Sequence, residues 1–102
     1  MRTLENKKFT IKLGDNEAPL SYAELCKEAI KAVPQGGFNL DDYAKRVKIL
    51  EVLEDAGDTI ELEDDHHTVL VSSLSNFKPA VLDKNIAEWI EAVKRAEDAG
   101  EL

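Results

Sequence analysis

One segment, from about Leu40 to Ala56, limits how the rest of this chain can fold. It has the signals of a helix, because Asn39 can cap its first turn and Gly57 can end it in a left-handed conformation. Its apolar residues form two adjacent stripes at helical spacing: Leu40, Tyr43, Ala44, Val47 and Leu50 in the first, and Ile49, Val52, Leu53 and Ala56 in the second. Such a wide surface must be covered on more than one side, by other helices of the chain or by a second copy of the protein.

Two more helices are predicted from their start signals. Ser21, with Glu24 three residues later, forms a capping box, and the helix that it begins ends at Pro34. Asp83 can cap a last helix that ends near Gly100. Their apolar faces are Tyr22, Leu25, Cys26, Ala29, Ile30 and Val33 in the first, and Leu82, Ile86, Trp89, Ile90, Val93 and Ala96 in the last.

The segment between these helices allows two interpretations. Asp64 and Asp65 can begin a helix, whereas the run from Thr68 to Val71 is equally typical of a strand. We favour the helix, whose inner face would be Val69, Leu70, Ser73, Leu74 and Phe77.

Two segments alternate apolar and polar residues, as half-buried strands do. Phe9, Ile11 and Leu13 share one face of residues 8 to 13, and Ile60 and Leu62 share one face of residues 58 to 63. Because an isolated two-stranded ribbon is marginally stable, we expect these strands to pair with each other and pack on the helices. The predicted fold is a single α+β domain over residues 1–102, with about four helices and a small antiparallel ribbon formed by residues 8–13 and 58–63.

Composition sets further limits. The chain has 102 residues, with 21 acidic and 13 basic side chains and a net charge of −8, and the acidity lies in its second half. No uncharged stretch is long enough for a membrane helix, and residues 1–8 lack the apolar segment of a secretory signal. The single cysteine, Cys26, fits a reducing compartment and is expected in the core. We therefore expect a cytoplasmic protein without a membrane partner.

The densest acidic segment, from Glu51 to Asp65, contains no Lys or Arg. Its charge repels phosphate backbones, which argues against direct nucleic-acid binding, and the basic run from Lys45 to Lys48 is too short for a recognition helix. Two interpretations stay open for the acidic segment. It is either a solvated face that keeps the protein soluble or a docking surface for a basic partner.

The sequence contains only weak signals of catalysis or metal binding. Residues Glu61–His67 hold four acids and both histidines, but the adjacent His66 and His67 diverge on a helix or a strand and cannot converge on one ion. The pairs of neighbouring aspartates, which could serve as acid and base, stand where helices are predicted to begin. The first turn of a helix favours negative charge, so their position needs no catalytic role. Trp89 suits either the core or an interface, and its apolar stripe favours the core. We predict no catalytic residue, cofactor or metal.

The middle of the chain resembles a group of small uncharacterised proteins encoded by tailed bacteriophages and prophages. The similarity covers residues 34–77: a Gly-containing turn at Pro34–Leu40, a helix with a basic start and an acidic end at Arg46–Glu54, a short strand at Thr59–Asp64, and then Leu70 and Leu74. It implies an accessory or morphogenesis protein that acts through protein contacts in the bacterial cytoplasm. It implies no catalytic residue.

The leading functional hypothesis is a non-enzymatic phage or prophage protein with an assembly or accessory role, acting through protein–protein contacts and self-associating as a homo-oligomer. Its candidate contact residues are Ile49, Val52, Leu53, Trp89, Glu54, Asp55, Glu61 and Glu63. One alternative is an acidic inhibitor of a host protein that mimics the charge of DNA. Another is a small metal-dependent enzyme or regulator that uses the Glu61–His67 cluster.

Overall fold

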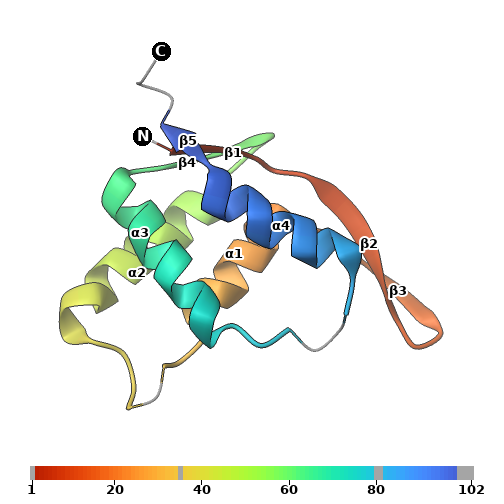
Figure 1. Ribbon diagram of the computed structural model, residues 1–102, viewed down its shortest axis with the longest axis horizontal. Helices are drawn as coiled ribbons and strands as arrows, with labels where there is room; N and C mark the ends of the chain where they lie inside the picture. The colour runs from red at the N-terminus through yellow and green to blue at the C-terminus, as the bar shows by residue number, and fades with distance from the viewer. Residues whose placement is uncertain (1, 35, 80–81, 99–102) are drawn as a thin grey trace.

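A computed structural model describes residues 2–34, 36–79 and 82–98, and these form an α+β fold (Figure 1). The strands are β1 (Arg2–Glu5), β2 (Lys8–Leu13), β3 (Asn16–Ser21), β4 (Thr59–Leu62) and β5 (Glu97–Asp98). The helices are α1 (Tyr22–Lys31), α2 (Leu40–Glu54), α3 (Asp64–Ser73) and α4 (Lys84–Arg95), and a short 3₁₀ turn, η1 (Leu74–Asn76), extends α3. The helical interpretation of the ambiguous segment is confirmed.

The predicted caps begin three of the four helices. The Ser21 side chain accepts a hydrogen bond from the Glu24 amide at 3.3 Å. The Asn39 side chain likewise accepts from the Asp41 amide at 2.8 Å, and Asp83 from the Asn85 amide at 2.7 Å. These bonds satisfy amides that the first turn of a helix leaves without partners. In α3, Asp64 and Asp65 stand in the first turn and Glu63 takes the cap position without a side-chain bond.

The predictions that gave Gly57, Val33 and Leu82 roles at helix ends are wrong. Gly57 does not end α2 in a left-handed conformation, because the helix stops at Glu54 and the cap residue Asp55 is right-handed. Val33 and Leu82 belong to no apolar helix face: they lie beyond α1 and before α4, and are 65% and 105% exposed. The predicted end of the last helix, Gly100, lies outside the described residues; α4 ends at Arg95.

The predicted pairing of residues 8–13 with residues 58–63 is also wrong. Strand β2 forms a hairpin with β3, and its turn contains Gly14 at φ 66°. A hairpin closes a shorter loop than the predicted long-range pair, so its entropic cost is lower. Strand β4 instead pairs antiparallel with β1, which also pairs with β5, in the order β4-β1-β5. The alternating pattern therefore identified two strands but not their partners.

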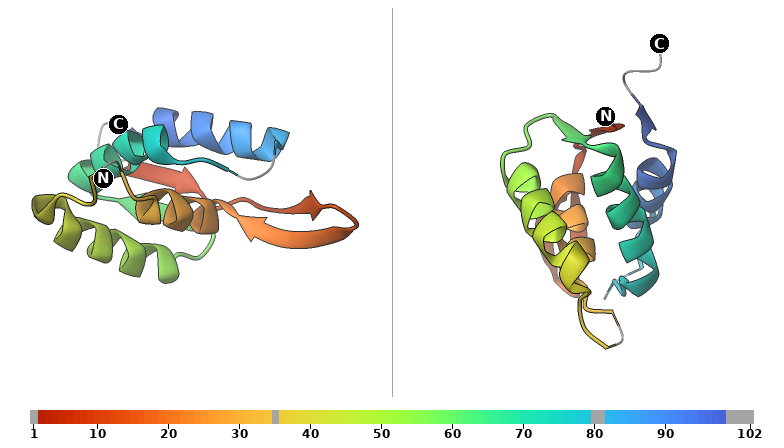
Figure 2. Two further views of the ribbon diagram at one scale, coloured as in Figure 1. Left: turned by 90° about the horizontal axis from the view of Figure 1, so that it is seen from below. Right: turned by 90° about the vertical axis from the view of Figure 1, so that its left-hand side faces the viewer.

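Helix α1 lies at the centre of the domain, with α2 on one side and α3 and α4 on the other (Figure 2, right). The β2–β3 hairpin extends away from the helices (Figures 1 and 2). Trp89 of α4 is fully buried, its indole Nε1 donates to Cys26 Sγ of α1 at 3.4 Å, and its ring meets Phe77 edge-on at 5.5 Å. Within the described ranges, no helix has the length and apolar character needed to cross a membrane.

Asn6 joins three elements at the end of β1. Its side-chain amide donates to the Gly57 carbonyl at 2.7 Å and its Oδ1 accepts from the Ala23 amide at 2.9 Å. Its backbone amide donates to the Asp58 carbonyl at 2.9 Å. One side chain thus connects the first strand to the start of α1 and to the turn before β4.

We predict that Asn6→Ala destabilises the fold by about 1–3 kcal/mol, because it leaves the amide of the buried Ala23 without a partner. Urea unfolding followed by circular dichroism measures the change. Asn16→Ala, at an exposed hairpin position, is the matched control and should change the free energy of unfolding by less than about 0.5 kcal/mol. Equal effects of the two substitutions would contradict the connecting role of Asn6.

Candidate protein-interaction site

The two apolar stripes of α2 have different environments. Ile49 and Leu53 of the second stripe are 0% and 2% exposed and belong to the core. Leu40, Tyr43 and Val47 of the first stripe are 86%, 54% and 44% exposed. We call these last three residues the outer face of α2. The helix therefore buries Ile49 and Leu53, which were predicted to meet a partner, and exposes three residues of the other stripe.

Three of the apolar contact candidates must be corrected accordingly. Ile49, Leu53 and Trp89 are buried within the chain, so a partner cannot reach their side chains without unfolding. Val52 is at the margin of exposure, at 36%, and lies away from the outer face of α2. The correction has a simple cause: both stripes have helical spacing, and the packing of α1 and α3 against α2 decides which of them is covered.

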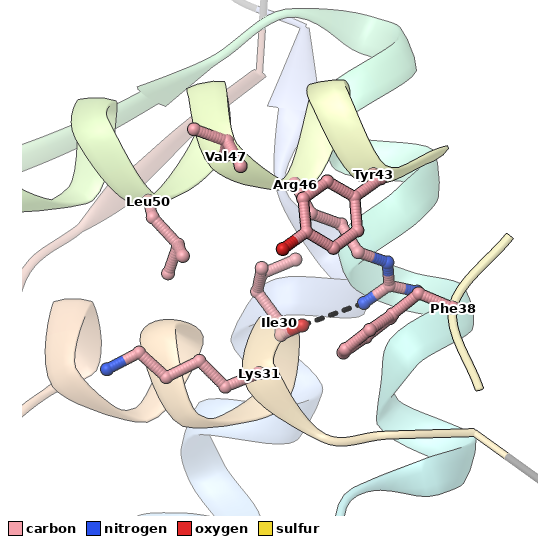
Figure 3. A pocket seen from close by; sticks show the side chains of 7 residues that line it. All are labelled: Ile30, Lys31, Phe38, Tyr43, Arg46, Val47 and Leu50. Carbon is pink, nitrogen blue, oxygen red and sulfur yellow. Dashed lines mark hydrogen bonds between the residues drawn. The ribbon is translucent and has the colours of Figure 1, made fainter. Parts of the chain in front are cut away.

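A pocket of about 200 Å³ opens between α1 and α2, beside the outer face (Figure 3). We call it the α1–α2 pocket; its lining residues are Ile30, Lys31, Phe38, Tyr43, Arg46, Val47 and Leu50. Phe38 and Tyr43 meet edge-on across the start of α2, with their ring centroids 6.2 Å apart. Two members of the outer face, Tyr43 and Val47, thus also form the wall of a concave apolar site.

Arg46 closes the end of this pocket. Its side chain is 9% exposed, and its Nη1 donates to the Ile30 carbonyl at 2.8 Å (Figure 3). Ile30 lies in the last turn of α1, where carbonyls lack helical partners and the helix dipole is negative. The guanidinium carbon also lies 5.1 Å from the centre of the Phe38 ring, a cation–π contact. Arg46 therefore caps α1 from the neighbouring helix.

Sequence reasoning assigned no role in protein contact to Arg46 or Phe38. A signal was present, because Arg46 lies three residues after Tyr43 and four before Leu50, on the apolar side of α2. A cation in that position needs a buried acceptor. The acceptor is a backbone carbonyl of another helix, which side-chain patterns do not reveal.

Three of the four acidic candidates lie together. Asp55, Glu61 and Glu63 line a second hollow of about 490 Å³, between the end of α2 and β4. We call it the acidic hollow; Lys48, Glu51, Val52 and His66 complete its lining. The fourth candidate, Glu54, is exposed but is not part of this lining. The register of β4 explains the grouping, since Glu61 and Glu63 alternate with the inward-facing Ile60 and Leu62.

The two histidines of the Glu61–His67 cluster point to different parts of the structure. The Nε2 of His67 donates to the Val93 carbonyl of α4 at 2.8 Å, whereas His66 faces the acidic hollow. This divergence is the one expected of adjacent residues on a helix. Among the described residues, no group of three or more His, Cys, Asp or Glu side chains is arranged to hold a metal ion.

Cys26 has the environment of a core residue rather than of a nucleophile. It is 0% exposed, and burial raises the pKa of its thiol from 9.0 to about 12, against a smaller lowering by the Trp89 hydrogen bond. The reactive thiolate is therefore disfavoured at neutral pH. Burial, with Glu88 and Glu5 nearby, also raises the pKa of the neighbouring Tyr22.

We expect the free energy of unfolding to fall as the pH rises from 9 toward 12, because the unfolded chain loses the Cys26 proton before the folded protein does. The stabilisation that comes from the protonated thiol is fully present below pH 9. Between pH 9 and pH 12 this group lowers the free energy of unfolding by at most about 1.4 kcal/mol per pH unit. Urea unfolding at a series of pH values measures the slope. Cys26→Ala should reduce the slope and leave the part due to Tyr22; an unchanged slope would contradict the assignment.

Comparison of the chain with family models, curated proteins and solved structures returned no match.

Proposed function

We propose that the protein acts by binding other proteins through the outer face of α2, with a second copy of itself as the first partner. The observation that supports this proposal is the exposure of Leu40, Tyr43 and Val47, three large apolar side chains on one side of one helix. Exposed apolar groups that cluster in this way are typical of interaction surfaces. The adjacent α1–α2 pocket offers a concave site for an anchoring side chain.

Self-association suits a surface of this kind. In a symmetric dimer the same patch of each copy meets the other, and a helix stripe can pack antiparallel on its own copy around a two-fold axis. The resemblance of residues 34–77 to small phage and prophage proteins supplies the proposed setting, an assembly or accessory role without catalysis. Both parts of the proposal depend on contacts that a single copy of the chain leaves open.

Light scattering at several protein concentrations tests self-association. We expect the wild type to form a dimer and Val47→Asp to be a folded monomer, because the charge would be buried in the dimer and solvated in the monomer. Val52→Asp is the matched control, since Val52 lies on the same helix away from the outer face and should leave the dimer intact. Circular dichroism establishes that each variant is folded.

Ile49→Glu completes this series. It places a charge in the core and should unfold the protein rather than dissociate a dimer. A wild type that stays monomeric at every concentration would exclude self-association. A dimer that Val52→Asp dissociates and Val47→Asp does not would move the interface away from the outer face of α2.

A second candidate function is the binding of a basic partner at the acidic hollow, as an inhibitor that mimics the charge of DNA would do. The observation in its favour is the grouping of Glu51, Asp55, Glu61 and Glu63 around one concave surface. Of the described Lys and Arg residues, Lys48 alone lines this hollow. A cluster of like charge in a concavity strengthens the local field and attracts a partner of opposite charge.

NMR titration with a short oligolysine peptide tests this second function. We expect shifts confined to the backbone around Asp55, Glu61 and Glu63 that vanish at high salt, because the contact would be electrostatic. The triple variant Asp55→Asn, Glu61→Gln, Glu63→Gln should lose them. Shifts spread evenly over all acidic residues, or retained in the triple variant, would count against a defined site.

A further inference from the structure

The α1–α2 pocket has a charge opposite to that of the protein as a whole. The chain carries a net charge of −8, but Lys31 and Arg46 both line this pocket, and no acidic side chain of the described residues does. The other lining residues are the apolar or aromatic Ile30, Phe38, Tyr43, Val47 and Leu50. The surroundings thus combine an apolar wall with positive charge.

The positive charge of Arg46 is only partly compensated. Its Nη1 has the Ile30 carbonyl and its guanidinium has the Phe38 ring, but its buried Nε has no hydrogen-bond partner among residues 2–34, 36–79 and 82–98. In the part of the chain that the structure describes, no carboxylate lies within ion-pair distance of Arg46. A buried guanidinium is best matched by a carboxylate, which offers charge and hydrogen-bond acceptors together.

The size of the pocket limits the apolar part of its ligand. An apolar cavity of about 150 Å³ holds a benzene molecule, so the 200 Å³ here fits one aromatic or branched aliphatic side chain. The apolar surface continues beyond the pocket, because Tyr43 and Val47 are about half exposed and Leu40 is 86% exposed one turn away. A ligand that covers all of it is longer than a small molecule, which favours a polypeptide segment.

We propose that the α1–α2 pocket binds a segment of a partner protein that inserts one large apolar side chain and presents a carboxylate beside it to Arg46 and Lys31. This inference rests on the proposed function, binding of proteins at the outer face of α2, and specifies the chemistry of a partner that would compete with the second copy for this face. The apolar anchor supplies buried area in the pocket. The carboxylate supplies the counter-charge that Arg46 lacks, and Lys31, exposed at the edge, adds long-range attraction.

Selection from a yeast-displayed library of random peptides of about twelve residues tests the inference without assuming a sequence. The full chain is the target, and Val47→Asp, which places a carboxylate in the pocket wall, is used to remove peptides that bind elsewhere. We expect the enriched peptides to share a large apolar residue with Asp or Glu close to it. Replacing that acid by its amide should weaken binding about tenfold, measured by fluorescence anisotropy.

A pair of lysine variants tests the charge on the protein. Lys31→Gln should weaken binding severalfold, whereas Lys27→Gln, on the same helix but outside the pocket lining, should not. Arg46→Met should weaken binding most, and thermal unfolding shows whether this variant is folded. If the variant is unfolded, the two lysine variants alone test whether the positive charge contributes to binding. Equal effects of Lys31→Gln and Lys27→Gln would overturn the proposed role of charge.

The remaining outcomes separate this inference from the proposed function. Enriched peptides that lack an acid, or no enrichment at all, would overturn the inference. Binding of 3-phenylpropionate alone as tightly as the peptides would identify a small-molecule site and also overturn it. If Val47→Asp still dissociates the dimer in either case, the outer face of α2 remains an interaction surface. If it does not, both proposals fail.

Discussion

The guanidinium of Arg46 at the carboxyl end of α1 is the constraint on which the rest of the site depends. A cation taken this far from water requires acceptors, and it finds them in the Ile30 carbonyl and the Phe38 ring. This contact joins α2 to the last turn of α1, and the packing of α1 and α3 against α2 buries Ile49 and Leu53 and leaves Leu40, Tyr43 and Val47 in solvent. The helix contacts that stabilise the fold therefore also decide which residues of α2 a partner can reach.

The parts of the fold that sequence reasoning predicted are those set by neighbours along the chain. Ser21, Asn39 and Asp83 each cap a helix through an amide two or three residues away, so their signals are complete within a short window. Strand pairing is different, because alternation in residues 8–13 defines a buried face and leaves the partner open. The turn at Gly14 allows residues 8–13 to pair with the segment that directly follows them, β3. Strands β1 and β5 lack a strong alternating pattern, so the sequence did not indicate that they pair.

The candidate site was predictable in composition and not in arrangement. The sequence indicated a helix with more apolar surface than one neighbour could cover, and such a helix is present. It could not indicate which stripe stays exposed, since Ile49 and Val47 are equally apolar and differ only in rotation about the helix axis. The grouping of the acidic candidates was easier to predict. Asp55, Glu61 and Glu63 are close in sequence, and the short connection between α2 and β4 keeps them together. Arg46 was missed because its acceptor is backbone.

The position of β1 between β4 and β5 has a consequence for biosynthesis. Arg2 is in register with both Leu62 and Asp98, so β1 completes its sheet only after segments that are translated much later have left the ribosome. The β2–β3 hairpin needs no such delay, because the strands that pair in it are adjacent along the chain. Until then neither edge of β1 is paired. Leu4, which is buried in the finished domain, is accessible to chaperones and to other nascent chains.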